Sequence, residues 1–311
     1  MSDVSGGLVG AIEAGGTKFV CAIGRRAGGE LLVRQQFPTG DDPERLMSEV
    51  VLWLSEQQRH LGRLAAVGVA SFGPLDLCEG SKTWGCITTT PKRGWQRADL
   101  LGPLRRGFPG VRLALDTDVN GAALGEQRWG AARGLEDFLY VTVGTGIGGG
   151  GMARGQLLHG LMHPEMGHML LPGAAGDDFA GVCPFHGRCW EGLCSGPAIA
   201  KRAGRAAEEL SPDDEVWSLT IRSMAQAMMN LTCVLSPRRI VLGGSVRKAG
   251  RLGEEQFFRR LRADLGELLA GYIGVLSLSG GVLEEYLVPP QLGDDAGVCG
   301  ALALGQDVLM C

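Results

Sequence analysis

Two glycine-rich turns, each set between apolar segments, constrain the fold of this chain more than any other feature. The first turn, Gly15-Gly16, separates the apolar runs Leu8–Ala14 and Thr17–Ile23. The second begins at Gly144 and follows the strand-like run Phe138–Val143. A glycine turn flanked by apolar runs is typical of a β-hairpin. Because the two hairpins lie about one domain apart, they indicate an internal duplication with one hairpin in each half.

Glycine-rich turns can hold phosphate groups, because their backbone N–H groups approach an anion without a side chain in the way. In the first turn, Thr17 adds a hydroxyl donor and Lys18 adds a positive charge. Taken alone, this turn is explained equally well as an ordinary hairpin. The second turn has the Gly-x-Gly-x-x-Gly spacing of a dinucleotide-binding loop, but strand-like residues 148–153 follow it where that motif requires a helix. We therefore expect one phosphate-binding turn in each half.

Two histidines and two cysteines lie close together after the second turn: His168, Cys183, His186 and Cys189. The last three are three residues apart, so a compact turn can direct them to one point. Zinc prefers four such nitrogen and sulfur ligands in a tetrahedron, and a site with four protein ligands is structural. Buried free cysteines beside loop histidines are the alternative. The spacing predicts a structural zinc site flanked by Glu165 and Glu191.

Polar and small residues follow two further strand candidates. The buried-type run Ala65–Ala70 continues into Ser71-Phe-Gly-Pro74. Small residues at a strand end leave room for a ligand, although a simple turn explains them equally well. Val111–Leu115 continues into Asp116-Thr-Asp118 and a helix that reaches Trp129. Either aspartate can cap this helix, and the N–H dipoles at a helix start favour an ionised carboxylate.

The remaining apolar patterns complete a mixed set of strands and helices. They predict strands at Leu31–Phe37, Arg239–Leu242 and Val282–Val288, and helices at Pro43–Arg59, Gly196–Leu210, Glu215–Leu235, Gln256–Leu269 and Val298–Leu309.

Composition excludes several classes of protein. The chain has 311 residues, of which 45% are hydrophobic and 21% charged, which is enough for two globular domains. A net charge of −4 leaves no excess of positive charge to bind a nucleic-acid backbone. The nine cysteines, mostly in apolar runs, indicate a reducing cytoplasm rather than a disulfide framework. Glu13 and Gly15 interrupt the first apolar run, so we expect neither a signal peptide nor a membrane span.

The stretch from Glu165 to Glu191 resembles the zinc-motif signature of the ROK family (repressors, open reading frames, kinases). The resemblance rests on Glu165-x-Gly-His168, the Cys/His cluster and Glu191, and it covers nearly the whole chain together with the other motifs. Most ROK members carry Cys-x-Cys-Gly-x-x-Gly-Cys, whereas Cys183-Pro-Phe-His186 is similar to the variant of bacterial ROK fructokinases. Ser71–Pro74 and Ile87–Trp95 also look like the sugar loops of those fructokinases.

The resemblance implies an α/β fold with two similar domains of the actin, Hsp70 and sugar-kinase type, and an interdomain nucleotide cleft. The N-terminal domain would comprise residues 1–115, with the final helix, about residues 296–311, packed back on it. The C-terminal domain would comprise residues 116–295 and carry the zinc-binding loop.

The function that the resemblance implies is ATP-dependent phosphorylation of a hexose, in the first place fructose to fructose 6-phosphate. Asp118 matches the catalytic base of the family, and Thr117 replaces the usual Asn. The residues implied to contact sugar are Gly73, Pro74, Lys92, Thr117, Asp118, Glu165, His168 and Glu191. Those implied to bind ATP are Gly15, Gly16, Thr17, Lys18, Gly144, Thr145, Gly146, Gly196, Gly243 and Gly244. Glu13, where most relatives carry Asp, is expected to face Mg²⁺ through water.

Other readings of the sequence stay open. Many ROK glucokinases have Pro-Asn where this chain has Pro91-Lys92, which favours fructose over the near alternatives glucose and mannose. ROK repressors carry a helix-turn-helix domain ahead of the first glycine turn, where this chain has only about nine residues and no basic helix, so DNA binding is not expected. A degraded kinase that only senses sugar is a further alternative. The expected partners are sugar, ATP and a second copy of the chain in a homodimer.

Overall fold

The computed structural model describes residues 7–174, 176–277 and 281–310 of the chain, which form two compact units. Unit 1 contains the described residues up to Gly134, the segment Leu157–Pro164 and the described residues from Gln291 onward. Unit 2 contains Leu135–Gln156 and the described residues of Glu165–Pro290. The expected domain boundary after residue 115 differs from this division. Helix α3 (Asp118–Trp129) belongs to unit 1, because it contacts the C-terminal helix α9 (Ala296–Asp307).

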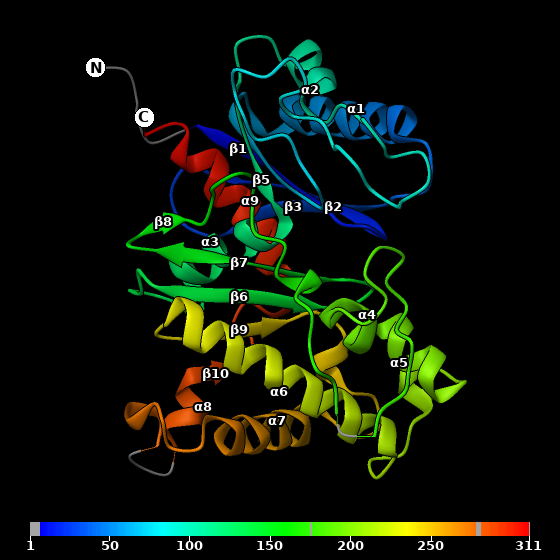
Figure 1. Cartoon of the computed structure of the whole chain (residues 1–311). Coiled ribbons are helices and arrows are strands. Elements are labelled where there is room, and N and C mark those ends of the chain that lie inside the picture. The colour runs from blue at the N-terminus through cyan, green and yellow to red at the C-terminus, as the bar shows by residue number, and fades with distance from the viewer. Residues whose placement is uncertain (1–6, 175, 278–280, 311) are drawn as a thin grey trace. The chain divides into compact units, whose positions relative to one another are not determined.

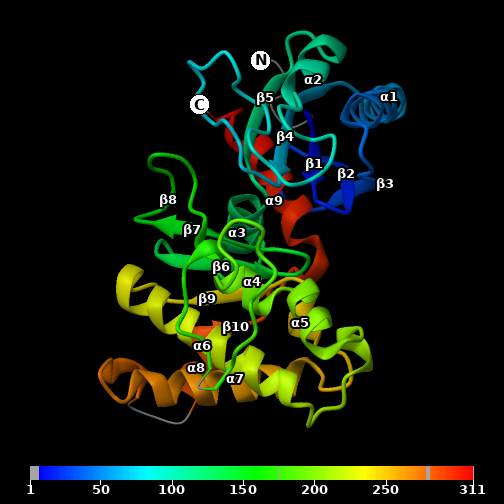
Figure 2. The same cartoon turned by 45° about the vertical axis from the view of Figure 1, so that its right-hand side comes forward.

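Unit 1 is built on a mixed five-stranded sheet (Figure 1), and its strand order, β3-β2-β1-β4-β5, can be followed in Figure 2. Its strands are β1 (Leu8–Ala14), β2 (Lys18–Arg25), β3 (Leu31–Pro38), β4 (Leu64–Ser71) and β5 (Arg112–Thr117). The predicted hairpin is confirmed, since β1 and β2 are antiparallel and Ala14 pairs with Phe19 across the turn. β4 and β5 lie parallel to β1, and Ala14 pairs with Ser71, which pairs with Thr117. The glycine turn therefore lies at the same sheet edge as the ends of β4 and β5.

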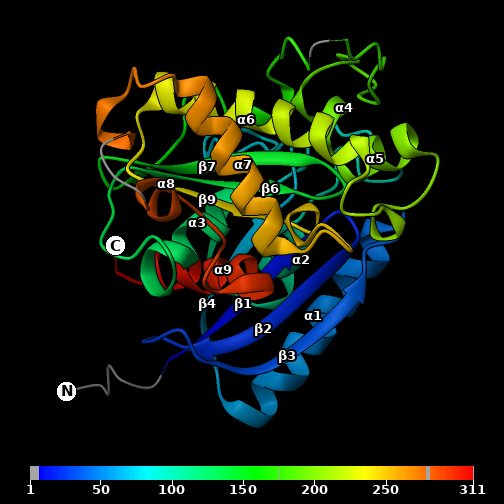
Figure 3. The same ribbon diagram turned by 90° about the horizontal axis from the view of Figure 1, so that it is seen from below.

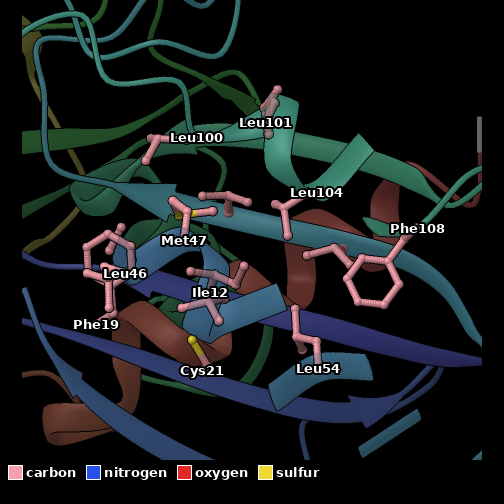
Figure 4. Close-up of a cluster of buried hydrophobic side chains, with 14 of the residues drawn as sticks. Ile12, Phe19, Cys21, Leu46, Met47, Leu54, Leu100, Leu101, Leu104 and Phe108 are labelled. Carbon is pink, nitrogen blue, oxygen red and sulfur yellow. The ribbon is translucent and has the colours of Figure 1, made fainter. Parts of the chain in front are cut away.

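Helix α1 (Pro43–Leu61) covers one face of this sheet. Pro43 follows an N-cap, Asp42, whose side chain accepts a hydrogen bond from the backbone N–H of Arg45. The buried residues of α1 recur at helical spacing, as the amphipathic pattern predicts: Leu46, Met47, Val50 and Leu54. They join Ile12 and Cys21 of the sheet and residues of α2 (Leu101–Gly107) in one hydrophobic cluster (Figure 4).

Helix α9 covers the opposite face of the same sheet (Figure 3), and it approaches both the sheet and α3 at glycines. A Cβ atom added at Gly68 of β4 would overlap the carbonyl oxygen of Ala301 in α9. A Cβ atom added at Gly300 of α9 would overlap the carbonyl oxygen of Gly121 in α3. The absence of a side chain at these two positions therefore allows direct backbone contact between the elements.

Unit 2 repeats the architecture of unit 1. Its sheet has the order β10-β9-β6-β7-β8, which is the strand order of unit 1 with β6 in the place of β1. The strands are β6 (Phe138–Val143), β7 (Ile147–Ala153), β8 (Gln156–Leu157), β9 (Ile240–Gly243) and β10 (Leu287–Val288). β6 and β7 form the second predicted hairpin, and β9 lies parallel to β6, as β4 does to β1. The expected α/β fold with two similar halves is confirmed.

Helices α6 (Glu215–Leu235) and α7 (Glu254–Leu269) lie side by side next to this sheet (Figure 2). Two short helices, α4 (Trp190–Cys194) and α5 (Gly196–Ala203), contact α6. The helix predicted over residues 196–210 ends early, because Gly204 adopts a left-handed φ of 69° and caps it.

The strand predicted at Val282–Val288 is wrong for most of its length. Residues Val282–Tyr286 form a helix, α8, and only Leu287 and Val288 pair with β9. The run does not alternate between buried and exposed positions, since Glu284 and Glu285 are both exposed. One helical turn instead buries Tyr286, whose hydroxyl donates a hydrogen bond to the Oγ1 of Thr232 at 2.9 Å.

Within the described ranges, every helix is too short or too polar to cross a lipid bilayer. The cysteines of those ranges are all free thiols, so the described part of the fold is held together without disulfides.

We predict that Gly300→Ala destabilises unit 1, because the added methyl group would push α9 away from α3. Overpacking typically costs about 1–3 kcal/mol, which exceeds the gain of up to about 1 kcal/mol in helix propensity of alanine over glycine. Denaturant unfolding measures the difference. Gly80→Ala is the matched control, because Gly80 is exposed and an added Cβ would have no atom within 4 Å. Equal unfolding midpoints for the two variants would contradict the close packing of α9 on α3.

Candidate functional site

The junction of β5 and α3 presents Asp118 at the carboxyl edge of the unit 1 sheet. Thr117 caps the helix, since its side chain accepts a hydrogen bond from the backbone N–H of Asn120 at 3.1 Å. Both capping alternatives, Asp116 and Asp118, are therefore wrong. Asp118 is the first helical residue, and its Oδ1 accepts from the N–H of Val119 at 2.9 Å. Desolvation raises the pKa of Asp118 to about 6.

Asp116 lies two residues earlier and has a different environment. It is buried, and its Oδ1 accepts hydrogen bonds from the N–H of Thr117 at 2.7 Å and from the Nδ2 of Asn120 at 2.9 Å. Its Oδ2 lies 2.9 Å from the Nε2 of His159. The hydrogen bond to Asp116 raises the pKa of His159. Asp116 is therefore a satisfied anchor, and Asp118 is the aspartate that stays available for a ligand.

The first glycine turn is braced from outside the hairpin. The N–H of Gly15 donates to the carbonyl of Lys18 at 3.0 Å and closes the turn. Thr39 adds two bonds, from its N–H to the Thr17 carbonyl at 3.0 Å and from its hydroxyl to the Gly15 carbonyl at 2.7 Å. Gly16, Thr17 and Lys18 remain exposed, and a Cβ atom at Gly16 would have no neighbour within 4 Å. A rigid, open turn with a lysine fits the predicted phosphate site.

Glu13 is the second-last residue of β1 and lies on the side of the strand that faces α9. A Cβ atom added at Gly297, in the first turn of α9, would overlap the Oε1 of Glu13. Burial, followed by the charge of Asp118, raises the pKa of Glu13 to about 7. Its Oε2 is buried and has no hydrogen-bond partner among the described residues. An orphaned carboxylate oxygen fits the predicted Mg²⁺ contact through water, because such a group needs a donor or a cation.

The two predicted sugar loops of unit 1 lie against each other. Thr88 donates from its N–H at 2.7 Å and from its hydroxyl at 3.1 Å to the carbonyl of Pro74. Lys92 follows in the second loop, where its N–H donates to the Oγ1 of Thr90 at 3.3 Å. The bond between the loops brings Gly73 and Pro74 next to the segment that carries Lys92.

The predicted nucleotide residues of unit 2 also come together. The N–H of Gly144 donates to the carbonyl of Gly146 at 2.9 Å and closes the second turn, and Thr145 at its tip is exposed. The N–H of Gly196, at the start of α5, donates to the carbonyl of Gly144 at 2.7 Å. Gly244, which follows Gly243 at the end of β9, has a φ of +86°, and an added Cβ would overlap the backbone of Val143.

Glu191 lies against this second turn, a contact that the sequence did not predict. Its Oε2 accepts a hydrogen bond from the N–H of Ile147 at 2.9 Å, and a Cβ at Gly146 would lie 2.7 Å from the same oxygen. The first turn of α4 carries Glu191, two residues after Cys189. The loop with the cysteines is therefore tied to the second glycine turn.

The four predicted zinc ligands gather at one point of unit 2, with their ligand atoms within 4.8 Å of one another. The Nδ1 of His168 lies 3.7 Å from the Sγ of Cys183 and 3.6 Å from the Sγ of Cys189. The Nδ1 of His186 lies 3.8 Å from the Sγ of Cys183. Tetrahedral zinc with bonds of about 2.1 Å to nitrogen and 2.3 Å to sulfur separates these atoms by about 3.6 Å. The donor set and its spacing therefore fit zinc.

Glu165 precedes a single helical turn, Met166–His168, and the N–H of His168 at its end donates to the carbonyl of Glu165 at 3.0 Å. Gly167 packs so closely on β7 that an added Cβ would overlap the carbonyl oxygen of Ile147. The Nδ1 of His168 faces the two thiols, so Nε2 is the ring nitrogen that can meet a second partner. Glu165 is exposed beside it.

Two histidines of unit 1, His159 and His163, reach the predicted site and were missed in the sequence. His159 bonds Asp116, and the Nε2 of His163 accepts from the N–H of Leu75, next to the first sugar loop. Their signal was present as His159-Gly-Leu-Met-His163-Pro, directly ahead of Glu165. Spacing alone did not show which loops these rings would meet.

Comparison with known proteins finds relatives along almost the whole chain. A model of the ROK family matches residues 9–308 of the chain. A putative fructokinase of Bacillus subtilis is 41% identical over 302 residues, which cover 97% of this chain and 96% of that protein. A fructokinase of Zymomonas mobilis is 40% identical over 300 residues, which cover 96% of each protein.

Solved structures show the same fold. A ROK hexokinase from Thermus thermophilus has a TM-score of 0.77 and 26% identity, covering 97% of this chain and 99% of that one. A ROK family glucokinase from Streptomyces griseus, solved with glucose and AMPPNP, has a TM-score of 0.71 and 21% identity. The match covers 97% of this chain and 100% of the glucokinase chain. The full-length family match, together with these relatives, leads to one conclusion: the chain belongs to the ROK family.

Proposed function

We propose that this protein is an ATP-dependent fructokinase, which transfers the γ-phosphoryl group of ATP to fructose and forms fructose 6-phosphate and ADP. The observation that carries the proposal is the identity of 41% to a putative fructokinase and of 40% to a fructokinase, along almost the whole chain. The contact of Thr88 with Pro74 supports it, because it joins the two loops that resemble fructokinase sugar loops.

Asp118 is proposed as the general base for the sugar hydroxyl. Phosphoryl transfer needs alignment, charge neutralisation and a base, and little covalent help from the protein. A pKa of about 6 suits this role, because Asp118 is then mostly ionised at neutral pH and is a stronger base than an ordinary carboxylate. Its neighbour Asp116 is occupied by donors and would hold the turn in place.

The sugar is proposed to be held by two sets of residues. The first is the loop at Gly73 and Pro74, together with Lys92 and Thr117. The second offers carboxylate and imidazole groups, which orient hydroxyls by hydrogen bonds: Glu165, His168 and Glu191. The Nε2 of His168 would face the sugar while its Nδ1 faces the metal.

The phosphates are proposed to lie at the two glycine turns, Gly15–Lys18 and Gly144–Gly146. The backbone N–H groups of each turn, with the hydroxyls of Thr17 and Thr145, would donate to phosphate oxygens. Gly196, Gly243 and Gly244 would leave room for the rest of the nucleotide. Mg²⁺, when bound, would neutralise charge on the β- and γ-phosphates, and Glu13 would hold it through water.

Zinc is proposed at the site of His168, Cys183, His186 and Cys189. Four protein ligands leave no open position, so the metal would order the loop and take no part in the chemistry. The loop leads into Glu191, which supports a role for the metal in placing that carboxylate.

Two alternative functions fit the same fold. Glucose or mannose phosphorylation is the first, because ROK hexokinase and glucokinase structures share the fold. A sugar sensor without turnover is the second, and consumption of ATP separates it from a kinase.

We predict that fructose gives the highest kcat/KM among fructose, glucose, mannose and N-acetylglucosamine. The fructokinase-like loops at Ser71–Pro74 and Thr88–Lys92 motivate this order. A coupled assay of ADP release across the four sugars measures it. A clear preference for glucose would overturn the choice of sugar, and sugar binding without any release of ADP would overturn the kinase.

We predict that Asp118→Asn lowers kcat by about 10²–10⁴-fold, the usual effect of losing a general base. For the same reason kcat/KM of the wild type should fall as pH drops through about 6, where Asp118 gains a proton. Asp213→Asn is the matched control, because Asp213 is exposed and lies outside the proposed site. Activity of Asp118→Asn within a factor of two of the control would remove Asp118 from the mechanism.

We predict one equivalent of zinc per chain, measurable by elemental analysis, and a joint loss of stability and sugar affinity in Cys183→Ser. Ordering a loop costs roughly 1–2 kcal/mol per residue, which the metal bonds offset. Loss of the zinc should therefore lower the melting temperature and raise KM for sugar more than KM for ATP.

Cys233→Ser is the control for the metal experiment, because Cys233 is exposed on α6. Mg²⁺ must be restored after any chelator before activity is read. Metal-free protein with an unchanged sugar KM would make the zinc a remote structural element, and the roles of Glu165 and Glu191 would lose their main support.

Three sequence-based expectations stay predictions. They are a cytoplasmic location, a homodimer and the absence of nucleic-acid binding. Sedimentation equilibrium of the purified protein would test the dimer.

A further inference from the structure

The segment Leu157–Pro164 belongs to unit 1, although the residues on both sides of it belong to unit 2. It carries two of the five histidines of the protein, His159 and His163. Each ring contacts a different element of unit 1, His163 the loop after β4 and His159 the end of β5. We call this segment the histidine strap.

The side chain of His163 binds the backbone of the first sugar loop. Its side chain is buried, and its Nε2 lies 3.0 Å from the N–H of Leu75, which is also buried. A backbone N–H can only donate, so Nε2 must accept and carries no proton. Nδ1 then carries the proton, and it lies 3.5 Å from the carbonyl oxygen of Pro164. Burial lowers the pKa of His163, which keeps the ring in the neutral form that this bond requires.

The same ring also packs on the loop from the side. A Cβ atom added at Gly73 would lie 3.2 Å from the Cε1 of His163 and 3.3 Å from its Nε2. His163 therefore touches the residues on both sides of Pro74. Thr88 in addition donates to the carbonyl of Pro74. The loop is therefore held by two separate segments of the chain, and the strap is one of them.

His159 holds the second element, the turn that leads to Asp118. Its Nε2 lies 2.9 Å from the Oδ2 of Asp116, the oxygen opposite the one that Thr117 and Asn120 occupy. Asn120 also bonds the strap directly, through its Nδ2 and the carbonyl of Leu158 at 3.4 Å. The strap is therefore bonded to the helix start as well as to the sugar loop.

We propose that the histidine strap positions the sugar site, with His163 setting the loop at Gly73–Leu75 and His159 setting the turn at Asp116–Asp118. Both histidines are positioning residues, because they act through the backbone of the loop and through Asp116. The inference rests on the proposed sugar kinase function. Its physical basis is that a loop held by few contacts loses its ordered conformation when one is removed, and the sugar must then order it again.

The test compares two substitutions of His163. In His163→Leu the buried N–H of Leu75 loses its acceptor, and KM for fructose should rise by about 10-fold or more, while KM for ATP stays within about twofold. In His163→Gln the side-chain carbonyl can accept from the same N–H, so most of the sugar affinity should return. His60→Gln is the matched control, because His60 is exposed near the end of α1.

A second readout does not depend on activity. Hydrogen exchange of the Leu75 amide should be faster in His163→Leu than in the wild type, and near the wild-type rate in His163→Gln. His159→Leu should raise the sugar KM and leave Leu75 exchange unchanged, because it acts on the other element. An equal rise of both KM values in His163→Leu, or unchanged protection of Leu75, would overturn the positioning role.

These outcomes can be told apart from failure of the proposed function. A wild-type protein that releases no ADP with any hexose would refute the kinase. Hexose binding by calorimetry and Leu75 exchange would then still decide whether the strap positions a sugar site. If another hexose is the substrate, the same variants are compared with that sugar.

Discussion

The close approach of α9 to the sheet and to α3 is the contact on which unit 1 depends. Backbone meets backbone at Gly68 and at Gly300, where any side chain would force the elements apart. This contact makes the last helix of the chain part of the first unit. It also determines the environment of Glu13, which points to the same face of β1 and lies against Gly297. The raised pKa of Glu13 therefore follows from the packing that holds the unit together.

The repeated strand order explains why the candidate residues gather where they do. In each unit a hairpin lies beside a parallel strand, so the turn of the hairpin and the end of that strand share one sheet edge. Parallel strands with loops at their carboxyl ends offer ligand sites at that edge. The two units then differ in what they add. Unit 1 adds Asp118 after β5, whereas unit 2 adds the Cys/His cluster and ties it to the second turn through Glu191.

Two aspartates that are two residues apart have different surroundings. Asp116 is saturated by donors from the backbone, from Asn120 and from His159. Asp118 is desolvated with fewer donors, and its pKa rises to about 6. The base proposed at Asp118 needs an available lone pair, whereas a carboxylate that holds a turn in place needs occupied oxygens. The histidine strap contributes to this difference, because His159 occupies the remaining oxygen of Asp116.

Much of the fold and part of the candidate site could be predicted from the sequence, because the signals are local. Some signals depend only on neighbours along the chain. They are the glycine turns between apolar runs, the helical repeat of buried residues and the ligand spacing in Cys183–Cys189.

The local pattern gave a wrong prediction at Val282–Val288, where the burial of a tyrosine rather than alternation decided the conformation. It also failed at the division into units, because only tertiary packing assigns α3 and the histidine strap to unit 1. The contacts of His163 with Leu75 and of Glu191 with Ile147 join residues 88 and 44 positions apart. Hydrogen bonds over such separations leave no periodic trace in the sequence, so only the folded chain decides them.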